Sequence, residues 1–427
     1  GSEMCIRDSY DRFLKAYLVF LDILAFYLSV GLLVVVRYGF NWEAFYYHFS
    51  GFSLILPFWL IVFYLNNLYD PKAYGYKNYF YTLNSFLAGF VISVILFYYQ
   101  PYLKISPKTN LILFVIYFLA LHLILRKKFN DQFLARNKIK ILFLAPQNLK
   151  LKTLNDLKNL PFFEVKAYVE TTDEIDNFDN LNLIVVSRKI KEREIQKLIE
   201  KIGFNLPIME LIDFYEKYFK RIILEEVDDY WLLKEIINPE HRVQLIFKRI
   251  FDIFLASILT LFLVLISPLI ILGIYLNSPG PLLFRQKRIG KNNKIFTLYK
   301  FRTMRPEEDR GIWAQKKDER IFAFGRFLRR LHLDELPQVI NIFKNELSFV
   351  GPRPEQVNIV AELEKSIPYF NLRHLVLPGI TGWAQINFNY ARTLEESKIK
   401  FEYDLYYLKN RNFILDLVII FKTIFNF

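Results

Sequence analysis

Long apolar segments alternate with short polar ones along the first 128 residues of the chain. Four stretches are almost free of charge and approach the roughly 20 residues that a helix needs to cross a bilayer; they lie at about 16–36, 52–69, 80–99 and 110–125. Tyrosine and tryptophan gather near their ends, as at Trp42 and Tyr69. The pattern predicts a bundle of four transmembrane helices over residues 10–128. A buried helical core is the alternative.

Between residues 138 and 240 the pattern changes to short apolar runs separated by charged stretches. The runs at 139–145, 165–170 and 183–187 are typical of buried parallel strands, and 192–202 has the spacing of a helix. These features predict a Rossmann-like α/β module. The turn after its first strand has no glycine that would let the main chain approach a pyrophosphate. We therefore expect a structural, dimerising or regulatory role and no bound dinucleotide.

A fifth apolar run covers residues 250–276 and contains Ser267 and Pro268. Proline in a helix interior removes a main-chain hydrogen bond and kinks the helix. Basic residues flank both ends of the run, Lys248 and Arg285 among them. Since a single crossing cannot leave both ends on one side, the pattern favours a re-entrant helix that enters the bilayer and returns. A plain fifth crossing is the alternative.

The composition is typical of a membrane protein with an anionic partner. Of 427 residues, 53% are hydrophobic and 18% aromatic, yet 56 Lys and Arg against 43 Asp and Glu leave a net charge of +13. Basic residues gather before the first apolar stretch and after the fourth, so the positive-inside rule places the chain after Arg126 in the cytoplasm. One cysteine excludes an internal disulfide. Nucleic-acid binding is disfavoured because the basic residues flank membrane segments.

Paired carboxylates in the last third of the chain are the candidate chemistry. Asp334 and Glu335 stand before an apolar stretch at 338–345 that has helical spacing, where acidic residues also serve as helix caps. Arg329 precedes them, and Arg353 follows between two prolines. Arginine binds phosphate bidentately, and Mg²⁺ takes one or two carboxylates plus phosphate oxygens. The setting favours a site for phosphate and Mg²⁺; helix capping remains the alternative.

A predicted hairpin adds further positive charge. Strands at 282–288 and 294–301 flank a turn at 290–293, and this hairpin carries Lys300 and Arg302 next to its end. A basic face that contacts lipid headgroups would explain most of these charges.

The residues from Lys248 onward resemble the catalytic domain of the bacterial monotopic phosphoglycosyl transferases, the polyprenyl-phosphate sugar-1-phosphate transferases. The motifs that carry the resemblance follow one another in the family's order: Lys248-Arg249-Ile250-Phe251-Asp252, Ser267-Pro268, Gly280-Pro281, Phe284-Arg285-Gln286, Lys300-Phe301-Arg302-Thr303-Met304, Leu333-Asp334-Glu335-Leu336-Pro337-Gln338, Ser348-Phe349-Val350-Gly351-Pro352-Arg353-Pro354 and Pro378-Gly379-Ile380-Thr381-Gly382-Trp383-Ala384-Gln385. The preceding helices and α/β module look like the long-form members that initiate exopolysaccharide or O-antigen assembly.

The resemblance implies a mainly α-helical, membrane-anchored catalytic domain over residues 241–427 at the cytoplasmic face of the bacterial inner membrane. It also implies a reaction. A hexose-1-phosphate passes from a UDP-hexose to undecaprenyl phosphate through a covalent aspartyl-phosphosugar, which gives a polyprenyl diphosphate sugar and UMP. The implied partners are these two substrates and membrane lipid, with a homodimer left open.

The same resemblance assigns residues to roles. It makes Asp334 the nucleophile and Mg²⁺ ligand and gives Glu335 a positioning or assisting role. The residues that it implies for substrate phosphate are Arg353, Arg329, Lys300, Arg302 and Arg373, and those for the nucleotide or sugar are Gly379, Thr381 and Gln385. The chain departs from the family pattern at Leu377 and at Phe388-Asn389-Tyr390, so the contacts of this last loop stay open.

Two other functions compete with this one. A membrane-tethered scaffold that binds nucleotide sugar or lipid without catalysis predicts that the variant Asp334→Asn keeps full function. A membrane-bound nucleotide-sugar dehydratase is disfavoured by the missing glycines and the shortness of the α/β module. The sequence does not name the sugar.

Overall fold

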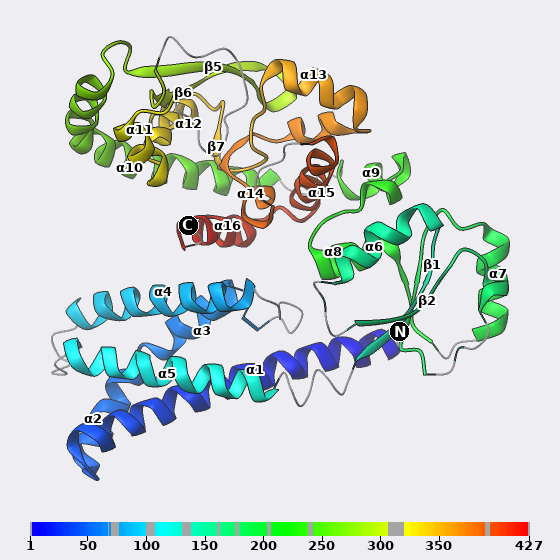
Figure 1. The fold of residues 1–427 in the computed structure, drawn as a ribbon, viewed down its shortest axis with the longest axis horizontal. Helices are drawn as coiled ribbons and strands as arrows, with labels where there is room; N and C mark the ends of the chain where they lie inside the picture. The colour runs from blue at the N-terminus through cyan, green and yellow to red at the C-terminus, as the bar shows by residue number, and fades with distance from the viewer. Residues whose placement is uncertain are drawn as a thin grey trace. The chain divides into compact units, whose positions relative to one another are not determined.

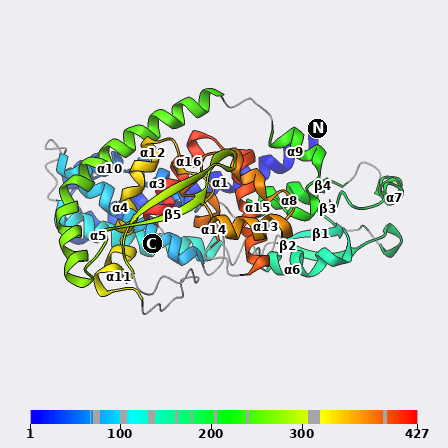
Figure 2. The same ribbon diagram turned by 90° about the horizontal axis from the view of Figure 1, so that it is seen from above.

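The structure is a computed structural model, and it divides into two compact units, Gly1–Phe219 with Ile424–Phe427 and Lys220–Thr423. Figures 1 and 2 show their helices and strands. The structure describes residues 2–425 apart from 67, 70–76, 100–106, 130–137, 159, 161–162, 176–177, 179, 203–205, 238–241, 306–319 and 389–392.

The first unit begins with a bundle of apolar helices: α1 (Ser2–Tyr38), α2 (Trp42–Ser53), α3 (Leu56–Leu65), α4 (Lys77–Tyr99) and α5 (Pro107–Phe129). α1 packs against α5 and α2, and α4 packs against α3 and α5. The centre of the bundle is aromatic. Ring centroids of Trp59, Phe63, Phe86 and Phe118 lie 5.0 to 5.8 Å from one another, so large apolar rings hold the helices together.

Several of these helices are long and apolar enough to cross a membrane. Among the described residues, Leu14–Tyr38, Tyr81–Tyr98 and Thr109–Phe129 meet this condition, which confirms the first, third and fourth predicted stretches as candidate crossings. α2 and α3 meet it only as a pair bent by 42°. The predicted bounds of 52–69 are therefore wrong. The Asn41 side chain caps α2 well before residue 52, and a proline in the first turn of α3 begins a new helix.

A cluster of charged side chains lies inside this bundle. Asp22 on α1 lies 2.8 Å from His122 and 2.7 Å from Arg126, both on α5. Arg126 also donates a hydrogen bond of 3.0 Å to the Leu68 carbonyl. The side chains of Asp22, His122 and Arg126 are all buried. Ionisable groups among membrane helices are costly unless they are paired, and here the pairing ties α1 to α5.

A parallel sheet follows the bundle in the chain. Its strand order is β2-β1-β3-β4, from β1 (Ile139–Leu144), β2 (Phe163–Val169), β3 (Leu183–Val186) and β4 (Ile208–Glu210). The helices in this region are α6 (Lys150–Leu157), α7 (Glu192–Ile202) and α8 (Leu211–Phe219). The three predicted strands and the predicted helix are confirmed. β3 is buried along its whole length, as expected for an inner strand of a parallel sheet.

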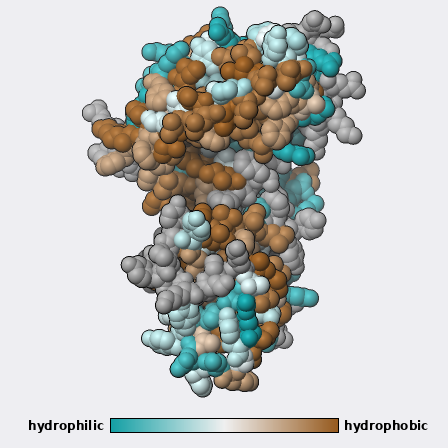
Figure 3. Space-filling model, turned by 90° about the vertical axis from the view of Figure 1, so that its left-hand side faces the viewer, coloured by the Kyte–Doolittle hydropathy of each residue, from teal (hydrophilic) through white to brown (hydrophobic). Residues whose placement is uncertain are grey.

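The second unit contains a long apolar helix, α10 (Arg242–Asn277). The helix continues through Pro268, and its ribbon changes direction along its length in both views (Figures 1 and 2). It too is long and apolar enough to cross a membrane. Most of its surface is exposed, with Leu265, Leu269 and Leu276 each at least 70% accessible. Apolar side chains gather on the face of this unit that Figure 3 turns to the viewer. Exposed apolar surface of this kind is typical of contact with lipid or protein.

The rest of the second unit surrounds two small strand pairs. The predicted hairpin is confirmed as antiparallel β5 (Leu283–Ile289) and β6 (Ile295–Phe301). Asn292 and Asn293 adopt the left-handed conformation in its turn, which Asn tolerates. β7 (Ser348–Val350) and β8 (Gly379–Thr381) form a parallel pair. The remaining helices are α9 (Asp229–Glu235), α11 (Ala323–Arg330), α12 (Val339–Phe343), α13 (Val357–Ser366), α14 (Trp383–Asn387), α15 (Leu394–Asn410) and α16 (Phe413–Phe425).

Candidate functional site

The paired carboxylates lie on a short 3₁₀ segment, Leu333–Gln338, between α11 and α12. His332 immediately before it has a φ of 53°, so the chain turns sharply after α11. The α-helix that follows is shorter than the predicted 338–345. Within the described chain, no side chain caps the start of the 3₁₀ segment or of α12. Asp334 and Glu335 therefore form no capping hydrogen bond, although both lie in the first turn of the 3₁₀ segment, where acidic residues complement the helix dipole.

Glu335 brings together two cations from distant parts of the chain. Its Oε1 accepts a hydrogen bond of 2.5 Å from Lys300 on β6 and one of 3.0 Å from Arg353, which follows β7. Burial alone would raise the pKa of Glu335, but the charges of Arg353 and Lys300 hold it well below its usual range. The two neighbouring cations thus favour the ionised form of Glu335, and its Oε1 contacts both of them.

Asp334 is the opposite case. It is only 7% exposed, yet its carboxylate forms no hydrogen bond or ion pair with any residue that the structure describes. Burial and the adjacent Glu335 raise the pKa of Asp334, while Lys300, Arg329 and His332 oppose the rise. The carboxylate oxygens of Asp334 are not among the fully enclosed atoms that lack a hydrogen-bond partner, but burial of the residue still disfavours its charged form. Such a group is expected where a ligand or a reaction requires it.

Arg329 reaches the same neighbourhood from α11. Its Nε donates a hydrogen bond of 2.8 Å to the Thr303 hydroxyl, just after β6. Gly325, one turn earlier on α11, allows this approach, because a Cβ there would lie 2.4 Å from the Thr303 carbonyl oxygen. The structure therefore brings together five of the predicted residues: Asp334, Glu335, Lys300, Arg329 and Arg353.

The loop that carries Arg353 is held by contacts between main chains. Gly351 donates a hydrogen bond of 3.0 Å to the Thr381 carbonyl, and Gly379 donates one of 3.0 Å to Pro352. A Cβ on Gly379 would lie 2.1 Å from the Gly351 nitrogen, and one on Gly382 would lie 2.2 Å from the Gly351 oxygen. Gly379 and Thr381, predicted for the nucleotide or sugar, thus pack against the Arg353 loop.

The other predicted residues contact protein groups. Arg302 donates to the carbonyls of Ser278 and Pro279, and Gln385 donates a hydrogen bond of 3.1 Å to Ile380. On α10, Ser267 donates to the carbonyl of the residue three positions earlier. These contacts position main chain rather than bring the side chains to the carboxylate pair.

Arg373 holds the Arg353 loop through a hydrogen bond to its main chain. It is only 3% exposed, and its guanidinium lies 2.8 Å from Asp404 and donates a hydrogen bond of 2.9 Å to the Arg353 carbonyl. Glu355 belongs to the same network: although burial alone would raise its pKa, the charges of Lys400, Arg373 and Arg288 lower it to about 2. This network fixes the main chain on both sides of Arg353.

The carboxylates of the site could bind one divalent cation together with a phosphate group of a substrate. Mg²⁺ commonly takes one or two carboxylates and completes its shell with phosphate oxygens and water. Asp334 offers a carboxylate, whereas Oε1 of Glu335 already contacts two cations. No group of three or more metal-ligating side chains occurs in the described part of the chain, so protein groups alone would not enclose a metal. These residues fit Mg²⁺ only together with a phosphate ligand.

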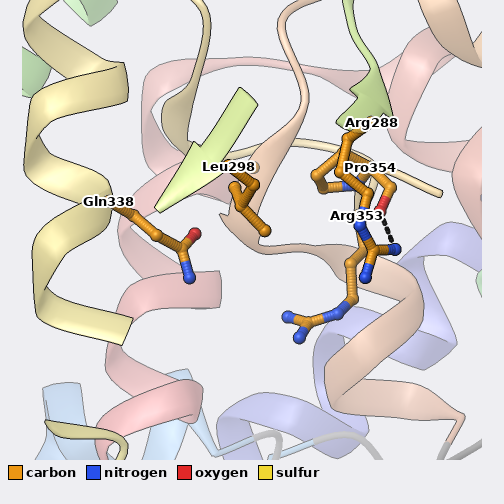
Figure 4. Close-up of a pocket in the computed structure, with 6 residues that line it drawn as sticks. Arg288, Leu298, Gln338, Arg353 and Pro354 are labelled. Atoms are coloured by element: carbon orange, nitrogen blue, oxygen red, sulfur yellow. Dashed lines mark hydrogen bonds between the residues drawn. The ribbon is translucent and has the colours of Figure 1, made fainter. Parts of the chain in front are cut away.

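A small hollow, open to solvent on one side, lies beside Arg353. Its lining consists of Arg288, Leu298, Gln338, Arg353, Pro354 and Gly379. In Figure 4, Gln338 and Arg353 approach it from opposite sides, and Arg288 donates a hydrogen bond of 3.0 Å to the Pro354 carbonyl. The hollow is thus bordered by hydrogen-bond donors.

Comparison with known proteins assigns the second unit to a family. Residues 243–427 match the family model described as bacterial sugar transferase. The exopolysaccharide production protein PSS of Rhizobium leguminosarum bv. phaseoli is 40% identical over 193 residues, which are 43% of this chain and 95% of that protein. The chain belongs to the bacterial sugar transferase family.

Two longer relatives of this bacterial sugar transferase have names that state an enzymatic activity. UDP-N-acetylgalactosamine-undecaprenyl-phosphate N-acetylgalactosaminephosphotransferase of Aeromonas hydrophila is 38% identical over 225 residues, 52% of this chain and 52% of that protein. UDP-glucose:undecaprenyl-phosphate glucose-1-phosphate transferase of Escherichia coli K12 is 36% identical over 252 residues, 57% of this chain and 54% of that protein. The chain thus matches about half of the length of each.

A further buried network in this sugar transferase, around Asp416, was missed by the sequence analysis. Lys248 pairs with Asp416, whose other carboxylate oxygen lies 2.9 Å from the Tyr407 hydroxyl. The Tyr407 hydroxyl also lies 3.3 Å from the carbonyl of Val350, the last residue of β7. Asp252 accepts a hydrogen bond of 3.1 Å from the main chain of β7. Lys248 and Asp252 belong to the motif at 248–252, and this motif was the signal from which the sequence analysis could have found the network.

Proposed function

We propose that this bacterial sugar transferase moves a sugar-1-phosphate, with a hexose as the sugar, from a UDP-sugar to undecaprenyl phosphate. Both named relatives above act on undecaprenyl phosphate, and each takes a different UDP-sugar. The observation that carries the proposal is the pairing of an engaged carboxylate, Glu335, with a buried and unpartnered one, Asp334, beside three cations. Phosphoryl transfer depends on positioning and on cations that stabilise charge on the phosphoryl oxygens.

In the first step, a carboxylate oxygen of Asp334 attacks the phosphorus that bears the sugar. The bond from this phosphorus to the bridging oxygen breaks, and UMP leaves with that oxygen. The product on the protein is an acyl phosphate that carries the sugar. Burial favours such a step because it removes water from the nucleophile. Arg353 and Lys300, held by Glu335, face the charge that develops on the phosphoryl oxygens.

In the second step, an oxygen of the undecaprenyl phosphate attacks the same phosphorus. The bond to Asp334 breaks, and the products are undecaprenyl diphosphate sugar and the free carboxylate. Mg²⁺, when bound, would neutralise charge on the diphosphate, with Asp334 as its protein ligand. The two steps use a single site in turn, so one carboxylate serves both substrates.

The membrane arrangement belongs to the same proposal. We place α10 in the membrane as a re-entrant helix, with the second unit on the cytoplasmic face of the bacterial inner membrane. Support comes from the basic flanks of the helix, its internal proline and its exposed apolar surface. The parallel sheet of the first unit would be a Rossmann-like module without a dinucleotide, and the glycan made would be an exopolysaccharide or O-antigen.

The test is UMP release by the full chain in lipid nanodiscs with Mg²⁺, undecaprenyl phosphate and a panel of UDP-sugars. We expect release with at least one UDP-hexose and a covalent, sugar-labelled protein when the acceptor lipid is left out. Arg353→Ala should lower the rate by about 100-fold or more. A non-catalytic scaffold would bind the same ligands and release no UMP above background, and that result would reject the proposal.

A further inference from the structure

Gln338 has a buried side-chain amide without a partner. The residue is only 3% exposed, and its Nε2 is buried with no hydrogen-bond acceptor among the described residues. An amide left unsatisfied in this way destabilises the folded protein. Folding alone gives no reason to keep a glutamine at this position, because an apolar side chain of similar size would avoid the cost. The amide is therefore a candidate ligand contact.

The amide borders the hollow described above. Arg353 enters the hollow from the opposite side, as Figure 4 shows, and Arg288 lies at its wall with a buried Nε that has no hydrogen-bond acceptor within the described structure. The lining includes no carboxylate; its other members are Leu298, Pro354 and Gly379. A pocket bordered by two guanidinium groups and an amide is complementary to an anion rich in hydrogen-bond acceptors.

We propose that the hollow is a phosphate subsite in which Gln338 Nε2 donates a hydrogen bond to a phosphoryl oxygen opposite Arg353. The inference rests on the proposed function, because that reaction supplies the phosphates. Gln338 ends the 3₁₀ segment that carries Asp334, so a phosphate held there is fixed relative to the carboxylate by a few residues of one short segment. Two sources share this chemistry: the UMP phosphate of the donor and the phosphate of the lipid acceptor.

The first experiment replaces the amide by an apolar group of similar length, Gln338→Met, in the full chain in nanodiscs. Because the native amide lacks a partner, we expect the thermal midpoint of the variant to stay equal or rise. One lost hydrogen bond to a charged ligand should lower kcat/KM by about 10- to 100-fold. A loss of function without a loss of stability is a signature that a structural role would not produce.

Asn341 provides the matched control. It is a fully buried amide three residues later, but its Nδ2 donates to Thr297 and Glu346 at 2.7 Å, and its Oδ1 accepts from Tyr299 at 3.3 Å. Asn341→Leu leaves these groups unpaired and should lower the thermal midpoint by several degrees. If Gln338→Met is destabilised to the same extent, Gln338 is a structural residue and the subsite is rejected.

Binding measurements separate the two phosphate sources and do not depend on turnover. Thermal stabilisation of wild type and Gln338→Met is measured with UMP, with undecaprenyl phosphate, and with inorganic phosphate. Loss of the UMP effect alone assigns the subsite to the nucleotide, and loss of the lipid effect alone assigns it to the acceptor. If all three ligands stabilise both proteins equally, or neither protein, the subsite does not exist. UMP could stabilise the wild type more than Gln338→Met while the wild type releases no UMP from any UDP-sugar. That result would reject the proposed function but support the phosphate subsite.

Discussion

Two of the buried charge clusters of this sugar transferase, one in the helical bundle and one in the second unit, are built in different ways. In the helical bundle, both carboxylate oxygens of Asp22 have a basic partner, His122 for one and Arg126 for the other. In the second unit, Glu335 is also engaged by two cations, but its neighbour Asp334 has no partner among the described residues. Burial and charge are common to both clusters; the unsatisfied carboxylate is found only in the second.

This difference separates two uses of buried charge. A saturated cluster holds elements together, and removal of one member leaves the others unpaired in a low dielectric. An unsaturated group costs stability in the ligand-free protein and gains a partner only when a ligand arrives. Substitutions at the two kinds of carboxylate should therefore have opposite effects on stability and activity.

The largest effect should come from Asp334→Asn. We expect UMP release to fall by more than about 1,000-fold, because an amide cannot act as the nucleophile. The thermal midpoint should stay equal or rise, since a buried carboxylate without a partner becomes neutral. UMP assays and thermal melts in nanodiscs measure both. Glu362→Gln, at an exposed position, serves as the control. Full turnover by Asp334→Asn would rule out the proposed mechanism.

Asp22→Asn should show the reverse. The change leaves Arg126 and His122 buried beside a neutral side chain, at a cost of about 3–5 kcal/mol. We expect a lower thermal midpoint for the bundle and unchanged UMP release per folded molecule. The exposed Glu43→Gln, on α2, should change neither. A melt that is indistinguishable from wild type would show that the Asp22 cluster does not hold α1 to α5.

The pH dependence of turnover should change when Glu335 is neutralised. In the proposed mechanism Asp334 must be ionised to attack, so activity is expected to fall as the pH drops through its raised pKa. Glu335 contributes to that rise, and Glu335→Gln removes its negative charge. The acid limb of kcat/KM should therefore move to lower pH, although the maximal rate also falls because Lys300 and Arg353 lose their anchor. An acid limb that moves to higher pH would contradict the assignment of Asp334 as the titrating group.

The smallest effect is expected from Tyr407→Phe. This variant removes the hydroxyl that lies near Asp416 and the Val350 carbonyl, just before the Arg353 loop. A hydrogen bond to a charged group, here the Asp416 carboxylate that pairs with Lys248, is worth about 1.5–3 kcal/mol, so the thermal midpoint should fall by several degrees and kcat/KM by a few-fold. The exposed Tyr230→Phe on α9 is the matched control. Equal values for both variants would show that Tyr407 does not position the loop.

Local patterns predicted the elements well, and contacts between distant residues decided the rest. The strands of the parallel sheet and the β5–β6 hairpin followed from apolar runs and turn residues. The second crossing had wrong bounds because capping by Asn41 and the proline at the start of α3 outweighed hydropathy. In the site, the carboxylate pair was visible as a motif. Which member is engaged depended on Lys300, 35 positions away, and no sequence pattern contained that contact.

The main-chain contact among Gly351, Gly379 and Gly382 bears on how such proteins are recognised from sequence. These glycines belong to the two motifs that most strongly mark the second unit, and a Cβ at any of them would collide with main-chain atoms. A motif search that matches them detects a tight crossing of two loops, which an inactive descendant of the fold would also need. In a distant sequence they therefore report that the domain can fold. Under the proposed mechanism, activity has to be judged from the residue that aligns with Asp334.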